Sequence, residues 1–139
     1  MWRSLATPPA SVVFLQRPFG RARGMAPANQ AAVLAAVAAH LLPGHMLEVF
    51  NASRGWRRDR ELFGRAKVML GPHGGAELNM LFSTPGTHVV EFTPMLRQAR
   101  PAPNTRPCYL GLALACGHTY WAVDPVGPFS FTGRRHPIT

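Results

Sequence analysis

Residues 71–79 read Gly-Pro-His-Gly-Gly-Ala-Glu-Leu-Asn and form the most informative pattern in the sequence. It follows an apolar run at residues 68–70 and leads into an apolar segment at residues 80–82. A hydrophobic strand that enters a glycine-rich turn and then a helix leaves backbone N–H groups unpaired at the helix N-terminus, where they favour an anion such as phosphate. His73 lies at the tip of this turn. Such turns are common in α/β proteins, so the turn alone does not identify a ligand.

Hydrophobic patterning along the rest of the chain predicts strands that alternate with helices. The expected helices cover residues 27–42, 56–65, 75–82 and 107–117, and the expected strands cover residues 11–16, 46–50, 67–70, 88–92 and 120–123. In the third helix of this series, Leu78, Leu81 and Phe82 have the i, i+3, i+4 spacing of a stripe that faces the core. Strands that are apolar on both faces and alternate with helices indicate an α/β fold with a Rossmann-like parallel sheet and right-handed crossovers.

Length and composition limit the possible classes of protein. The 139 residues fit a single domain, and the segment at 125–139, which contains Pro and Gly, is expected to be an irregular tail. The net charge of +9 predicts an anionic partner, either a nucleic acid, an anionic membrane or a phosphorylated ligand. Codon bias is the alternative, because the chain is also rich in Ala, Pro and Gly and its arginines are scattered. The longest apolar stretch, residues 31–42, is shorter than the roughly 20 residues that cross a bilayer.

The block from residue 61 to residue 94 resembles glycosyltransferase family 61. In that family a strand leads to Gly-Pro-His-Gly-Ala and a Leu-Thr-Asn-like helix, and a Pro-Gly turn and a strand closing in Glu-x-x-Pro follow. The positions in register are Ala66, Gly71, Pro72, His73, Gly74, Asn79, Leu81, Phe82, Pro85, Gly86, Val89, Val90, Glu91 and Pro94. Three positions depart from the pattern: Lys67 replaces an Asp, Glu77 an apolar residue and Leu78 a Thr-like residue.

This resemblance implies one half of a GT-B-type glycosyltransferase. Such an enzyme transfers a hexosyl or pentosyl group from a nucleotide sugar, usually a UDP-sugar, to a glycan or protein hydroxyl with inversion. Family members are typically anchored in the Golgi or endoplasmic reticulum by an N-terminal membrane helix. Because this sequence shows no such helix, we expect the chain to be the C-terminal nucleotide-sugar-binding part. An N-terminal acceptor domain and a membrane anchor would be missing. We therefore expect the chain alone to bind UDP weakly and to transfer no sugar, and the sequence identifies no catalytic base.

The expected donor site follows from the sheet, because ligands of such sheets bind beyond the carboxyl ends of the strands. Arg17 and Arg21 follow the first strand and resemble the family's phosphate-contacting arginines, whose forked donors suit a diphosphate. The predicted contacts with the nucleotide sugar are Arg17, Arg21, His73, Gly74, Gly75 and Glu91, of which Glu91 would contact a ribose hydroxyl. Asn79 is expected to brace the loop. No Asp-x-Asp pair and no zinc-ligand spacing is present, so we expect neither a cofactor nor a metal.

Two other classes stay open. A non-catalytic remnant of such an enzyme would fit the short chain and Glu77. A basic nucleic-acid-binding module would fit the charge, but the chain has neither a stripe of Lys and Arg nor an aromatic platform. Binding to any DNA that depends on salt and is unaffected by UDP would favour the second of these classes.

Overall fold

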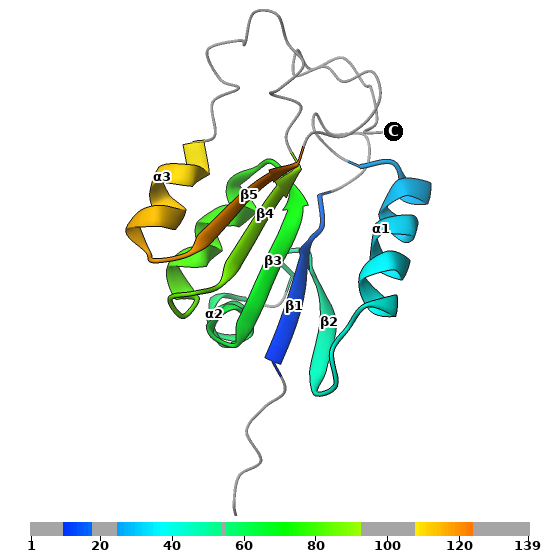
Figure 1. Cartoon of the computed structure of the whole chain (residues 1–139), viewed down its shortest axis with the longest axis horizontal. Helices are drawn as coiled ribbons and strands as arrows, with labels where there is room; N and C mark the ends of the chain where they lie inside the picture. The colour runs from blue at the N-terminus through cyan, green and yellow to red at the C-terminus, as the bar shows by residue number, and fades with distance from the viewer. Residues whose placement is uncertain (1–9, 18–24, 54, 93–107, 124–139) are drawn as a thin grey trace, which may run out of the picture.

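The computed structural model describes residues 10–17, 25–53, 55–92 and 108–123, in which strands and helices alternate (Figure 1). The strands are β1 (Ala10–Leu15), β2 (His45–Phe50), β3 (Ala66–Pro72), β4 (His88–Phe92) and β5 (Thr119–Val123). The helical segments are α1 (Pro27–Ala39), α2 (Trp56–Gly64), the 3₁₀ helix η1 (Gly75–Phe82) and α3 (Cys108–Ala115). Each strand and helix that the sequence predicts is present, with ends that differ by no more than three residues.

The five strands form one sheet in the order β2-β1-β3-β4-β5, and every neighbouring pair is parallel. This is a Rossmann-like α/β arrangement, as the alternating pattern predicts. The carboxyl ends of the strands therefore share one edge, which carries the loops that follow them. From β1 the chain turns outward to β2, whereas from β3 it turns the opposite way to β4. The loops after β1 and β3 consequently diverge, and such a switch point is where open α/β sheets bind ligands.

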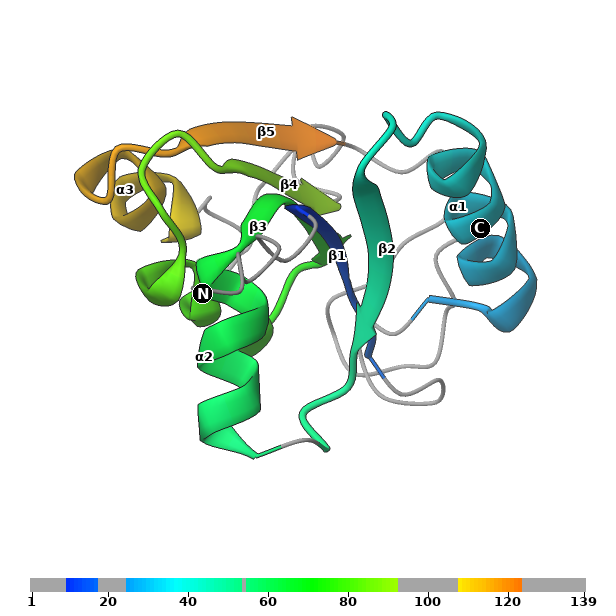
Figure 2. The same ribbon diagram turned by 90° about the horizontal axis from the view of Figure 1, so that it is seen from below.

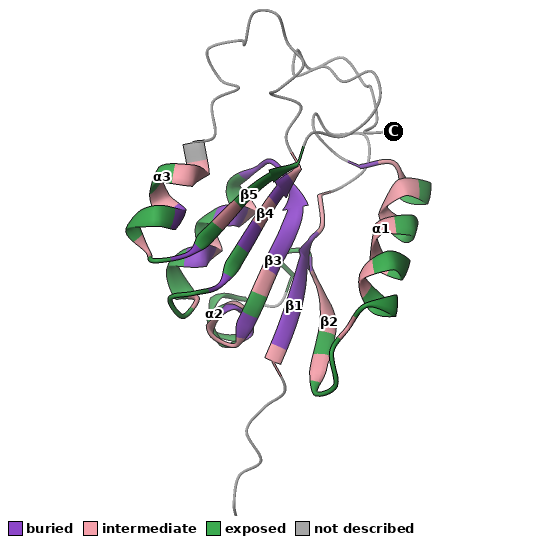
Figure 3. Ribbon diagram, viewed as in Figure 1, coloured by how far each residue is buried: buried purple, intermediate pink, exposed green. Residues whose placement is uncertain are grey.

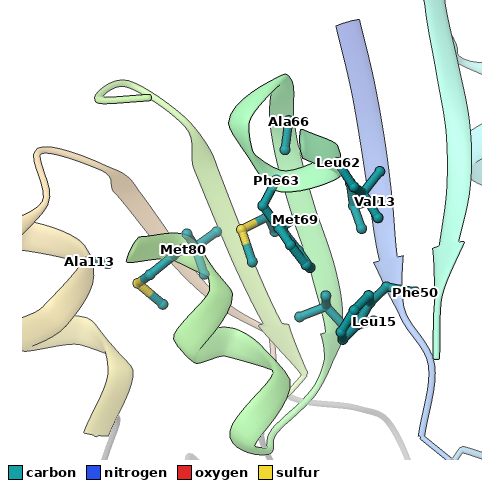
Figure 4. Packing of buried hydrophobic residues seen from close by; sticks show 10 residues of the cluster. Val13, Leu15, Phe50, Leu62, Phe63, Ala66, Met69, Met80 and Ala113 are labelled. Atoms are coloured by element: carbon teal, nitrogen blue, oxygen red, sulfur yellow. The ribbon is translucent and has the colours of Figure 1, made fainter. Parts of the chain in front are cut away.

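Helices cover both faces of the sheet. Figure 2 shows α1 on one face and α2, η1 and α3 on the other. Along β1, Val12 and Phe14 pack in the cluster on the α1 face, while Val13 and Leu15 belong to the cluster on the opposite face. Figure 4 shows that opposite cluster, whose buried members are Val13, Leu15, Phe50, Leu62, Phe63, Ala66, Met69, Met80, Val89 and Ala113. The central strands β1 and β3 are the most deeply buried (Figure 3).

One glycine at the sheet edge is required by a close approach of two strands. A Cβ atom placed on Gly71 would lie 2.7 Å from both the Cβ atom and the carbonyl oxygen of Leu15. Carbon and oxygen atoms in protein interiors do not approach this closely without displacing the backbone. The absence of a side chain at Gly71 therefore lets the end of β3 lie tightly against the end of β1, on the side where the glycine loop begins.

The predicted apolar stripe of the helix after β3 is wrong. Leu78, Leu81 and Phe82 are 50%, 58% and 45% exposed, whereas Glu77 and Met80 are buried. The segment is a 3₁₀ helix, in which residues three apart lie on the same side, so Glu77 and Met80 share the face toward the sheet. The helix therefore buries a carboxyl group beneath the glycine loop, where the sequence pattern predicts leucine.

Candidate functional site

The switch point holds a cavity. Its volume is about 510 Å³, within the range of small-molecule sites. The loops after β1, β2 and β3 and the first turns of η1 line it, and the lining residues are Leu15, Gln16, Arg17, Phe50, Asn51, Ala52, Pro72, Gly74, Gly75, Ala76 and Asn79. Four of the predicted residues, Arg17, Gly74, Gly75 and Asn79, thus meet at one cavity.

A second cavity, of about 430 Å³, lies on the α1 face toward the amino ends of the strands. Its lining is mostly apolar but includes Lys67 and three histidines; the lining residues are Val12, Val37, His40, Leu41, Leu42, His45, Lys67, Val68, Leu70 and His88. It has no glycine loop and no helix N-terminus, and it lies at the end of the sheet opposite to the switch point. The first cavity is therefore the better candidate for a ligand site.

The start of η1 supplies backbone donors to this cavity. Helix geometry leaves the N–H groups of Gly75 and Ala76 without an acceptor inside the helix, and both residues line the cavity. The Gly74 N–H is already used, since it donates to the Glu77 side chain at 3.0 Å. Two adjacent backbone donors at the end of a helix form a small electropositive site that suits a phosphate oxygen.

Arg17 links the loop after β1 to the loop after β3. Its Nη1 atom donates to the carbonyl oxygen of His73 at 2.9 Å. The guanidinium also lies directly against the glycine loop, because a Cβ atom placed on Gly74 would be only 2.0 Å from Nη1. Arg17 therefore adds a fixed positive charge with forked donors beside the N–H groups of η1, and together they are suited to an anion with several oxygens.

His73 and Glu91, by contrast, lie on the inner side of the glycine loop. His73 is 6% exposed and Glu91 is fully buried. The His73 Nδ1 atom is hydrogen-bonded to one carboxylate oxygen of Glu91, and the hydroxyl of Tyr120 on β5 donates to the other. The His73 ring also packs at a tilt against Tyr109 of α3, with 5.4 Å between ring centroids. Neither His73 nor Glu91 is among the residues that line the cavity.

The family model for glycosyltransferase 61 matches residues 3–90, which is more than half of the chain. The chain belongs to the glycosyltransferase 61 family. A search of curated proteins gives no match. Membership of this glycosyltransferase family implies a sugar donor and an acceptor in general terms, and it agrees with the resemblance that the Gly-Pro-His-Gly motif carries in the sequence.

The Glu77 carboxyl is the main departure of this glycosyltransferase 61 domain from the family pattern beneath the loop. Burial raises the pKa of Glu77 to about 9, and the nearby Glu91 carboxylate adds to the rise, while hydrogen bonds from the backbone and the Arg17 charge oppose it. Glu77 is therefore neutral at pH 7. Its Oε1 atom is buried without a hydrogen-bond partner among the described residues. Because Glu77 carries no charge, it accepts from Gly74 without placing a negative charge under the cavity.

Of the two remaining predicted residues, Asn79 and Arg21, only Asn79 lies within the described residues. Asn79 lines the cavity, and its amide donates to the carbonyl oxygen of Ala76 at 2.9 Å. This bond lies within the first turns of η1, where a bracing group would act. Arg21 lies outside the described residues, so its predicted contact with the donor stays a prediction.

The site predicted from the sequence includes no residue from the loop after β2 and none from β5. Asn51 and Ala52 follow β2 directly and line the cavity; the parallel sheet already indicates that this loop lies on the ligand edge. Tyr120 could not be predicted, because its hydroxyl contacts Glu91 through the pairing of β5 with β4, which no local sequence pattern reveals.

Within the described ranges, no group of three His, Cys, Asp or Glu side chains is arranged to hold a metal ion. Every helix there is also too short or too polar to span a bilayer.

Proposed function

We propose that this glycosyltransferase 61 domain is the nucleotide-sugar-binding half of a GT-B-type enzyme and that its donor is a UDP-sugar. The observation that supports this proposal is the cavity at the switch point, where Arg17 lies beside the N–H groups at the start of η1. The diphosphate of the donor would lie between them. The uridine would extend along the loops after β1 and β2, past Gln16 and Asn51.

The proposed chemistry is transfer of a hexosyl or pentosyl group to a glycan or protein hydroxyl with inversion. The acceptor oxygen attacks the anomeric carbon opposite the diphosphate while a general base removes the hydroxyl proton. As the glycosidic bond to the diphosphate breaks, negative charge develops on the leaving oxygens. Arg17 and the N–H groups of Gly75 and Ala76 would stabilise this charge in place. The neutral Glu77 carboxyl would not repel it.

In the proposed enzyme, the two halves have different roles. The base and the acceptor site would come from an N-terminal domain of the same enzyme, located in the lumen of the Golgi or endoplasmic reticulum. By this proposal, residues 1–139 alone bind UDP but transfer no sugar. Sugar transfer from a UDP-sugar by the purified chain would contradict these separate roles.

Calorimetry with UDP tests the donor site directly. Arg17→Lys keeps the charge but loses the paired donors, so we expect the affinity for UDP to fall by about 1–2 kcal/mol. Arg57→Lys is the matched control, because Arg57 is exposed on α2, where its guanidinium carbon lies 5.5 Å from the centroid of the Trp56 ring. Equal affinities of the two variants would refute the diphosphate clamp. Salt-dependent DNA binding that UDP does not displace would favour a nucleic-acid module instead.

A further inference from the structure

A series of hydrogen bonds, buried at Glu91 and His73, runs beneath the glycine loop. It starts at Tyr120 on β5, whose hydroxyl donates to Glu91 on β4. The second oxygen of Glu91 pairs with Nδ1 of His73 after β3. The carbonyl oxygen of His73 then accepts from Nη1 of Arg17 after β1, at 2.9 Å. Four residues from four strands or their loops are thus joined from the edge of the sheet to the candidate donor cavity.

Each hydrogen bond of this series fixes the orientation of the group that makes the next one. Tyr120 donates to one oxygen of Glu91, and in the tautomer with a proton on Nδ1 the His73 ring donates to the other. The backbone of His73 is held as well, because its N–H donates to the carbonyl oxygen of Phe92 at 3.2 Å. With both the ring and the N–H fixed, the His73 carbonyl has a defined direction, and that direction is toward Arg17.

We propose that Tyr120 is a positioning residue of the donor site, which orients Arg17 through Glu91 and His73. The proposal rests on the proposed function for its effect on UDP. Tyr120 does not touch the cavity, yet its hydroxyl holds Glu91 in place at the centre of the series. A guanidinium that is held before the ligand arrives loses less side-chain entropy on binding, which is how such supporting residues raise affinity.

The neighbouring residue Trp121 provides a matched control. Tyr120 and Trp121 both lie on β5 and both donate to a side chain of β4, but on opposite faces of the sheet. Trp121 donates through Nε1 to Nδ1 of His88 at 3.1 Å, and it is 52% exposed. Tyr120→Phe and Trp121→Phe therefore each remove one donor from the same strand. Only Tyr120→Phe removes a hydrogen bond from the series that leads through Glu91 and His73 to Arg17.

The experiment combines calorimetry with NMR of the Arg17 side chain. We expect Tyr120→Phe to weaken UDP binding about 3- to 10-fold, and Trp121→Phe to change it less than about twofold. On an Arg17→Lys background, Tyr120→Phe should cost less than about twofold more, because both changes act through the same guanidinium. Unchanged affinity in Tyr120→Phe, or a full additive loss in the double variant, would overturn the proposal.

The NMR measurement separates this inference from the proposed function, because it needs no ligand. In the unliganded chain, the Arg17 guanidinium signals should shift or average in Tyr120→Phe and stay unchanged in Trp121→Phe. If the wild-type chain fails to bind UDP while this NMR difference is present, the donor assignment is wrong and the positioning role of Tyr120 stands. If the Arg17 signals are the same in all three proteins, Tyr120 does not position Arg17, whatever UDP does.

Discussion

The two sides of the glycine loop after β3 use different kinds of chemical group. The side toward the cavity presents backbone N–H groups and the guanidinium of Arg17, which comes from the loop after β1. The inner side holds His73, Glu77 and Glu91, all buried. The titratable side chains beneath the loop thus form hydrogen bonds within the protein, while the groups suited to an anion come from the backbone and from a neighbouring loop. Stability should therefore respond most strongly to substitutions on the inner side, and ligand affinity most strongly to substitutions on the cavity side.

The largest expected effect is on stability and comes from the inner side. Glu91→Ala removes the carboxylate that holds the buried His73 ring and the half-buried Tyr120 hydroxyl. We expect the free energy of unfolding to fall by about 3–5 kcal/mol. Arg17→Ala, on the cavity side, should cost about 1 kcal/mol, because Arg17 is half-buried and its bond to the His73 carbonyl oxygen is lost. Urea denaturation of both variants measures the difference.

UDP binding should reverse this order for the same two positions. Arg17→Ala should lower the affinity at least about tenfold in a chain that is still folded, as expected for loss of a charge-assisted bond. If Arg17→Ala and Glu91→Ala destabilise the fold equally, the two sides of the loop do not have separate roles.

A smaller effect, which depends on pH, concerns Glu77. Its pKa is raised from 4.5 to about 9 in the folded chain, where Glu91 and Arg17 are the charged groups that act on it. Between these pH values the folded state keeps a proton that the unfolded chain releases, so stability falls as the pH rises through this window. Glu77→Gln keeps an acceptor for Gly74 but has no proton to lose. Relative to wild type, the variant should gain on the order of 2–4 kcal/mol between pH 5 and pH 8.

Urea denaturation at several pH values checks this expectation. Glu61→Gln, which changes an exposed carboxylate on α2, is the control and should follow the wild-type pH dependence. Parallel curves for Glu77→Gln and wild type would mean that Glu77 is charged in the folded chain. The cavity would then have a negative charge beneath it, and the proposed diphosphate site would lose part of its support.

The sequence predicted the elements of the fold well, because each strand or helix has a local pattern of apolar residues and turn residues. The shared edge of the sheet followed from its parallel strands. The orientation of the side chains at that edge could not be predicted, because the positions of His73 and Glu91 in the sequence do not show whether they face the cavity. Their orientation depends on contacts with Tyr120 and Tyr109, which come from distant segments. The stripe on η1 failed for a related reason: the spacing of Leu78, Leu81 and Phe82 suits an α-helix, and η1 is a 3₁₀ helix.

The smallest expected effect separates two adjacent glycines of the loop. A Cβ atom at Gly74 would lie 2.0 Å from Arg17 Nη1, which is the end of a flexible side chain and can move away. The backbone at Gly74 is extended, with φ at 169°, so alanine fits it without strain. Gly74→Ala should therefore cost only about 1 kcal/mol of stability, close to the value of the lost bond between Arg17 and His73.

Affinity, not stability, is the decisive measurement for Gly74. Displacement of Arg17 takes its donors away from the start of η1, so UDP binding should weaken about 5- to 10-fold, as for the loss of one charge-assisted bond. Gly75→Ala is the matched control: no atom lies within 4 Å of the added Cβ, and the pattern that this loop resembles has alanine there. It should bind UDP as the wild type does and be as stable or slightly more so, because alanine restricts the unfolded chain. If both variants bind UDP equally well, the orientation of Arg17 against Gly74 does not matter for the donor, and the cavity side of the loop acts through its backbone alone.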